Sequence, residues 1–403
     1  AGTYFPKYGL FSGFYKLKIY IYPAFIGFAF LTTRQISFSF WVFFILGGLL
    51  FGLLAVMGYT IPAAALGITF GPTLSRPEEM QMVGAYGIFF IFLVWLARYH
   101  LMDVARQAFG RAPDSTSRAA WFSTRLAAWG FICGTLLIVA WLHLLGVAVW
   151  VSGLVVGSFL MITLVASRII TQGGLAYFTL TAAPLDGVTT LFGTGIFSAA
   201  GIFIAGVVQK VLFLDLRESL MPSLVHASRV TEKVRQRRRM ITGIGIALML
   251  GVAVSFVAML ALCYRYGIRE LGLDWASGST LATYDNIVTL IETPHETSQW
   301  VRTFALVGAA VMLLLVIGYH RFYWWPLHPI GYLTCYSSAM RILWFSFFVG
   351  WLCNALCMRY GGVELFKKIR FLFIGLIVGD FLMGGIWALL GLFSDASYQV
   401  LPT

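Results

Sequence analysis

The stretch FLFIGLIVGDFLMGGIWALL, residues 371–390, decides the fold class because it holds a single charged residue. A helix needs about 20 mostly apolar residues to cross roughly 30 Å of hydrocarbon, and this stretch supplies them. Its one charge, Asp380, lies at the middle of the run. The stretch therefore predicts a membrane-spanning helix that carries a carboxylate at bilayer depth.

The whole chain has the composition of a membrane protein. Of its 403 residues 60% are hydrophobic and 11% are charged, whereas soluble domains are roughly a quarter charged. The short alternating segments of about 10 residues that mark barrel strands do not occur. We therefore predict an all-α fold, a polytopic transmembrane helical bundle of about 9–11 spans with broken or re-entrant segments.

Apolar length separates clear spans from short or interrupted pieces. The pieces at 19–33, 169–186 and 324–336 are apolar but too broken to be confident spans. The clear spans are 36–58, 80–97, 123–145, 147–167, 190–209, 240–263, 303–319, 338–357 and 370–392.

Loop charge predicts the orientation. Lys and Arg concentrate in 98–125, 210–239 and 358–370, which places these loops in the cytoplasm, whereas the acidic loop 264–301 faces outward. The net charge of +12 follows from this bias, so nucleic-acid binding is not expected. The lipid bilayer is the first expected partner of such a chain.

The predicted spans and loops divide the chain into four parts. Residues 1–35 form a short N-terminal apolar or amphipathic segment. Residues 36–263 form the first transmembrane group, 264–301 the outer loop, and 302–403 the C-terminal group. An even number of crossings must separate loops on the same side, so the breaks at 169–195 and 322–337 must each supply a passage.

The sequence FYWWPLHPIGYL, residues 322–333, is the more prominent break. Pro326 and Pro329 remove backbone donors and Gly331 loosens the helix, and irregular backbone at membrane depth lines a cavity or is buried in protein. His328 lies between the prolines and is a candidate for a solute or ion path. Alternatively, the aromatic residues form an interfacial belt and His328 lies at the surface.

The other break, 173–195, combines flexible backbone with hydroxyl groups. Gly173, Gly174 and Pro184 interrupt the helix, and Thr181 would satisfy a freed carbonyl or meet a ligand. Asp186 adds a carboxylate to the same candidate path.

Charges within spans are the remaining candidates, because they are costly at bilayer depth. Asp380 would carry a proton or cation, or else form a structural ion pair with Arg168, Arg341 or Lys210. Arg168 would hold a carboxylate or phosphate of a solute, or else anchor its helix at the inner face. Asn354 lies on an apolar helix and would hydrogen-bond to a neighbour.

No metal, cofactor or enzyme is expected from these residues. The histidines lack metal-ligand spacing, and no nucleophile and base share a known motif. The cysteines read as small buried hydrophobic residues. They are Cys133, Cys263, Cys335, Cys353 and Cys357.

Several stretches resemble a known family. RFYWWPLHPIGYL, RYGGVELF at 359–366 and SRIITQGGLAYF at 167–178 look like parts of large bacterial polytopic membrane proteins classed as domains of unknown function. Members are sometimes labelled as similar to oligopeptide transporters. The resemblance implies further spans before the equivalent of Tyr22, and hence a missing N-terminal half or a partner membrane subunit. It also implies an acidic residue at the place of Asp380, and a location in the bacterial cytoplasmic (inner) membrane.

Two functions follow as hypotheses. The first is a secondary transporter of a small, peptide-like solute, working by alternating access with proton coupling. The second is a non-catalytic subunit that anchors or scaffolds a larger membrane complex.

Overall fold

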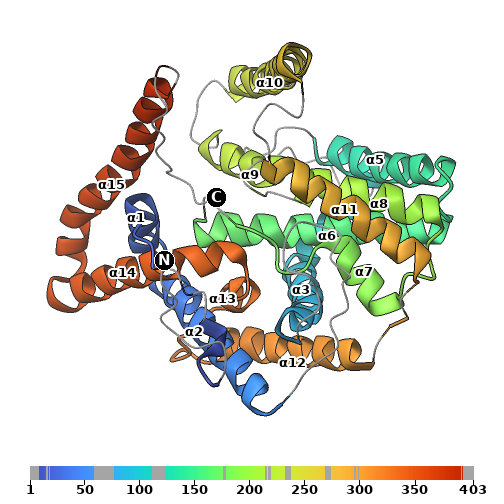
Figure 1. The fold of residues 1–403 in the computed structure, drawn as a ribbon. Coiled ribbons are helices and arrows are strands. Elements are labelled where there is room, and N and C mark those ends of the chain that lie inside the picture. The colour runs from blue at the N-terminus through green and yellow to red at the C-terminus, as the bar shows by residue number, and fades with distance from the viewer. Residues whose placement is uncertain are drawn as a thin grey trace.

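A computed structural model shows an all-helical chain (Figure 1). It describes residues 9–14, 17, 19–58, 77–110, 123–175, 178–213, 216, 219–231, 237–267, 274–294, 296–297, 299–391 and 393. The helices are η1 (Ser12–Phe14), α1 (Pro23–Leu31), α2 (Arg34–Val56), α3 (Pro77–Leu96), α4 (Arg98–Ala108), α5 (Thr124–Leu144), α6 (Val149–Gly173), α7 (Pro184–Phe192), α8 (Ala199–Phe213), α9 (Leu220–Thr231), α10 (Arg237–Tyr266), α11 (Asp274–Glu292), α12 (Gln299–Arg321), α13 (Pro329–Thr334), α14 (Ser338–Tyr360) and α15 (Gly362–Leu390).

The polytopic all-α prediction is confirmed. Seven described helices are long and apolar enough to cross a membrane, and α3 and α4 together form an eighth candidate that bends by 62°. The seven are α2, α5, α6, α10, α12, α14 and α15.

The predicted span 190–209 differs from the structure. It is divided between α7, which ends at Phe192, and α8, which has only 15 residues. Gly193 follows α7 with a φ of 79°, a left-handed conformation that a residue with a side chain rarely adopts. Glycine therefore ends the first piece and divides the span.

The predicted loops are partly helical. Helix α4 occupies the start of 98–125, α9 lies within 210–239, and α11 lies within 264–301. Only Gly361 separates α14 from α15, so most of 358–370 is helix. Residues 111–122, 232–236 and 268–273 of these loops lie outside the described part of the chain.

Two helical hairpins form the centre of one half of the fold. In each, a short helix that begins with proline precedes a long one: α1 with α2, and α13 with α14. Helices α2 and α14 are antiparallel, because successive aromatic contacts involve higher residue numbers on α2 and lower residue numbers on α14. These contacts join Phe38 to Trp351 at 5.2 Å, Trp41 to Phe348 at 5.2 Å, and Phe44 to Trp344 at 5.5 Å.

The two hairpins also exchange their short helices. Gly331 of α13 lies against Ser39 of α2, and Tyr336, just after α13, lies against Gly47 of α2. Helix α13 therefore runs parallel to α2. Helix α1 also runs parallel to α14, because the start of α1 contacts an earlier position of α14 than its end does. Each short helix therefore packs on the long helix of the other hairpin. Helix α13 therefore runs opposite to α14.

A second close contact joins α3 and α12. A Cβ atom on Gly308 of α12 would overlap the carbonyl of Gln81, and one on Gly84 of α3 would overlap the carbonyl of Ala305. Glycines at such positions let two backbones approach closely. This pair of helices borders the hairpins through α13.

Candidate functional site

Three short helices, α1, α7 and α13, interrupt the membrane part of the chain. Each begins with a proline, and the residue before it is extended, as sterics before proline favour. Proline suits the first helical position because that amide would be unpaired in any case. The prolines are Pro23, Pro184 and Pro329, and two of them are the predicted breaks.

In each short helix, the backbone N–H of the residue after the proline donates to a polar side chain. Asp380 Oδ2 accepts from Ala24 N–H at 2.9 Å. Gln209 Oε1 accepts from Leu185 N–H, and His328 Nδ1 accepts from Ile330 N–H at 3.2 Å. Buried backbone donors must be paired, and these three side chains pair them.

Asp380 and Asn354 hold the two ends of α1. The Asp380 side chain is buried and lies at the N-terminus of α1, where the helix dipole favours a negative charge. Asn354 Nδ2 donates to the carbonyl of Phe30, near the other end, at 2.7 Å. The structure therefore gives both residues a contact with the same short helix.

Asp186 belongs to a similar arrangement on α7. Its side chain is buried, and its Oδ1 accepts from Gln209 Nε2 at 3.1 Å. Gln209 thus caps α7 and contacts the carboxylate of its first turn. Sequence reasoning missed Gln209, although an amide near the end of an apolar run is itself a signal.

Two serines link the hairpins reciprocally. The backbone N–H of His328, before α13, donates to Ser39 Oγ of α2 at 2.7 Å. The backbone N–H of Tyr22, before α1, donates to Ser346 Oγ of α14 at 3.0 Å. Each hairpin therefore supplies a hydroxyl to the start of the other hairpin's short helix.

His328 occupies the connection between α12 and α13 and is buried. Its ring lies 4.6 Å from that of Tyr319, and its Nε2 lies 3.2 Å from the Gln172 side-chain amide. The ring thus caps α13 through Nδ1 and contacts α6 through Nε2.

This cap predicts a stabilising role for His328. His328→Ala leaves Ile330 N–H, a buried donor, without its acceptor, and we expect the free energy of unfolding to fall by about 1 to 2 kcal/mol. His328→Asn keeps an acceptor for Ile330 and should lose less stability in thermal unfolding.

The matched control is His100→Ala, because His100 is an exposed histidine on α4. It should be as stable as the parent protein. Equal stability of His328→Ala and the parent protein would show that the ring does not cap α13.

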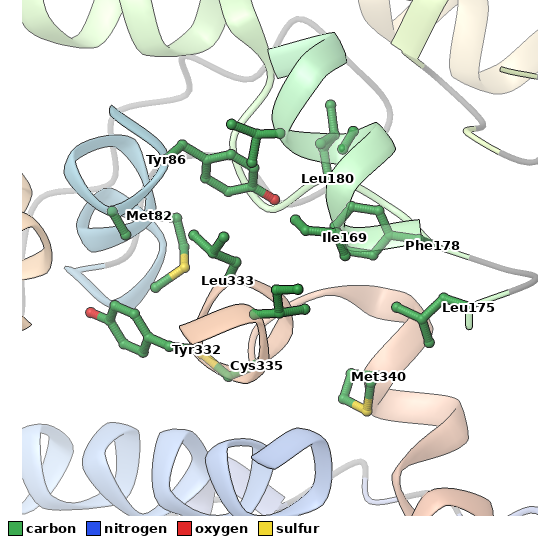
Figure 2. Close-up of a cluster of buried hydrophobic side chains, with 14 of the residues drawn as sticks. Met82, Tyr86, Ile169, Leu175, Phe178, Leu180, Tyr332, Leu333, Cys335 and Met340 are labelled. Atoms are coloured by element: carbon green, nitrogen blue, oxygen red, sulfur yellow. The ribbon is translucent and has the colours of Figure 1, made fainter. Parts of the chain in front are cut away.

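The two predicted breaks meet at the centre. Thr181 Oγ1 donates to the carbonyl of Leu333 at 3.4 Å and lies 3.5 Å from Tyr86 Oη. Thr179 Oγ1 lies 2.8 Å from Ser338 Oγ. Figure 2 shows a cluster of buried apolar side chains that includes Tyr86 and Leu333, the two partners of Thr181. The labelled ones that pack together include Ile169, Leu175, Phe178, Leu180, Leu333 and Cys335.

The remaining predicted residues lie at the edges of this core. Gly173 ends α6, and Gly174 follows in the left-handed conformation with a φ of 63°. Arg168 is exposed on α6. Pro326 lines an open groove together with Trp324 and Trp325. Within the described ranges, no group of three His, Cys, Asp or Glu residues is placed to hold a metal ion.

Comparison with known protein families identifies the family of the chain. A family model described as "Family of unknown function (DUF6785)" matches residues 1–402. No curated protein matches the chain. No solved structure matches it either.

Proposed function

We propose that this chain, which belongs to the DUF6785 family of unknown function, is a secondary transporter of a small, peptide-like solute. Transport would proceed by alternating access around the two hairpins. The observation that carries this proposal is the reciprocal exchange of α1 and α13 between antiparallel hairpins. Inverted pairs with discontinuous helices recur in transporters, where the solute binds at the interrupted helices.

The proposed binding region lies where the two breaks meet. Its polar groups are the Thr181 hydroxyl, the Tyr86 hydroxyl and the pair formed by Gln172 and His328. These neutral donors and acceptors suit amide groups, and Arg168 at the end of the region would attract a solute carboxylate. The binding region would open only when the apolar contacts of this core separate. The structure therefore corresponds to a closed state in this proposal.

Asp380 provides a route for proton coupling within this proposal. Its carboxylate contacts the first turn of α1, where a negative charge is favourable and a neutral acid less so. Protonation would therefore weaken the hold on α1 without removing the side chain. A proton taken up at Asp380 would bias the position of α1 relative to α14 and α15.

Peptide-driven currents in proteoliposomes test transport. We expect a pH gradient and a pool of di- and tripeptides to produce a transient current that empty liposomes lack. Asp380→Asn should abolish the pH dependence while the protein remains folded. Absence of current with every peptide, neutral, acidic and basic, would reject a peptide-like solute.

A second candidate, a non-catalytic anchoring subunit, is favoured by a different observation. The most apolar window of α10 has 0% of its residues buried, and that of α5 has 6%. Those faces would contact partner subunits, and the filled core would be permanent. Cross-linking in native membranes would then join α5 or α10 to one stoichiometric partner chain, and no peptide would drive a current.

A further inference from the structure

We propose that a groove at the ends of α2 and α14 binds the phosphate of an anionic phospholipid headgroup. The groove has a volume of about 760 Å³. Two arginines line it, Arg34 at the first position of α2 and Arg359 near the end of α14. This inference is independent of transport and uses none of the residues proposed for the solute.

The charge of the groove selects an anion. The described residues of its lining include the two guanidinium groups and no acidic side chain. Among the residues that the structure describes, neither groove arginine forms an ion pair with a carboxylate. Guanidinium groups recognise phosphate through paired hydrogen bonds. Gln35 adds a neutral donor beside Arg34.

The position of the groove at the membrane boundary favours a lipid headgroup as its ligand. Arg34 begins one candidate span and Arg359 nearly ends another, so both guanidinium groups lie at a membrane boundary. Tryptophan and tyrosine concentrate at headgroup level because one part of each ring system is apolar and one part polar. Tyr323, Trp324 and Trp351 line the same groove.

The rest of the lining fits the glycerol and the upper acyl chains of such a lipid. Phe38, Ala355 and Met358 offer apolar surface beside the arginines. A free phosphate ion would use the guanidinium groups but would leave this apolar surface unoccupied. The combination of two cations with an aromatic and aliphatic wall therefore favours a lipid over an inorganic ion. The face concerned is the one that carries the predicted inner loop 358–370.

Native mass spectrometry of the full chain in mild detergent tests the site. The protein would be titrated with phosphatidylglycerol, with phosphatidylcholine of the same acyl chains, and separately with inorganic phosphate. We expect phosphatidylglycerol to bind at least 10-fold more tightly than phosphatidylcholine. The double variant Arg34→Gln/Arg359→Gln should lose that preference, and each single variant should lose part of it.

Arg265→Gln is the matched control. Arg265 is an exposed arginine near the end of α10 and lies over the ring of Tyr266 at 5.3 Å, as Arg359 lies over Tyr360 at 5.8 Å. It does not line the groove, so its variant should retain the preference. Both groove arginines are exposed, and thermal unfolding of the double variant should match that of the parent protein.

Three outcomes would overturn the proposal. The double variant could retain the preference for phosphatidylglycerol, or Arg265→Gln could lose it equally. Inorganic phosphate at millimolar concentration could bind or displace the lipid completely, which would assign the groove to a free anion.

Discussion

Asp380→Ala will lower the free energy of unfolding by about 2 to 3 kcal/mol, because it leaves a buried backbone donor of α1 without its acceptor. The donor is Ala24 N–H, and the Asp380 carboxylate lies 2.9 Å from it. Thermal unfolding of the purified protein in one detergent measures this loss. Because α1 packs between α14 and α15, the loss should extend to both helices.

Asp380→Asn separates the structural role of this residue from proton coupling. The asparagine side chain keeps an oxygen acceptor for Ala24 N–H but cannot ionise, so its stability should fall by about 1 kcal/mol or less. If Asp380→Asn and Asp380→Ala lower the free energy of unfolding equally, the charge of Asp380 stabilises the fold and the hydrogen bond alone does not. If neither variant loses stability, the capping role of Asp380 is wrong.

Gly308→Ala will destabilise the protein by about 3 kcal/mol, because its methyl group would overlap the backbone carbonyl of Gln81 on α3. A carbonyl cannot turn aside as a flexible side chain can, so α3 and α12 would have to move apart. Thermal unfolding and the yield of monodisperse protein measure the effect.

Gly87→Ala provides the control on the same helix pair. Gly87 lies on α3, and nothing is within 4 Å of the position that its Cβ would occupy. Alanine has the higher helix propensity, by up to about 1 kcal/mol, so this variant should be as stable as the parent or more stable. Equal effects of Gly308→Ala and Gly87→Ala would contradict the close contact of α3 with α12.

The spans and the breaks were predictable from the sequence because they depend on local properties. Apolar length alone locates α2, α12 and α14 to within a few residues. Pro184 and Pro329 mark helix starts because proline lacks a backbone donor and fixes its own φ angle. The glycine at 193 divides a span for an equally local reason, but an apolar run hides it.

The partners of the candidate residues were not predictable, because they are distant in the sequence. Asp380 contacts Ala24 across 356 positions, and His328 contacts Ser39 across 289. Periodicity reports which face of a helix is apolar, but it does not report which helix will cover that face. A buried carboxylate was therefore found from the sequence, whereas its acceptor role at a helix start needed the fold.

The exchange of short helices was hidden for the same reason. Nothing in the composition of residues 19–33 indicates that they lie along α14, or that Ser39 and Ser346 occupy matching positions. The two serines look like ordinary polar residues in apolar runs. Their equivalence emerges only from the antiparallel packing of α2 against α14.

Labelling of Cys335 from each side of the membrane tests alternating access. Cys335 lies in the break 322–337 and is buried in the central cluster, and a variant that retains it alone would be treated with an impermeant maleimide in oriented vesicles. Alternating access predicts labelling from both sides, whereas a variant that lacks all five cysteines stays unlabelled. Protection of Cys335 from both sides, in folded protein at every pH, would contradict transport and favour the anchoring subunit.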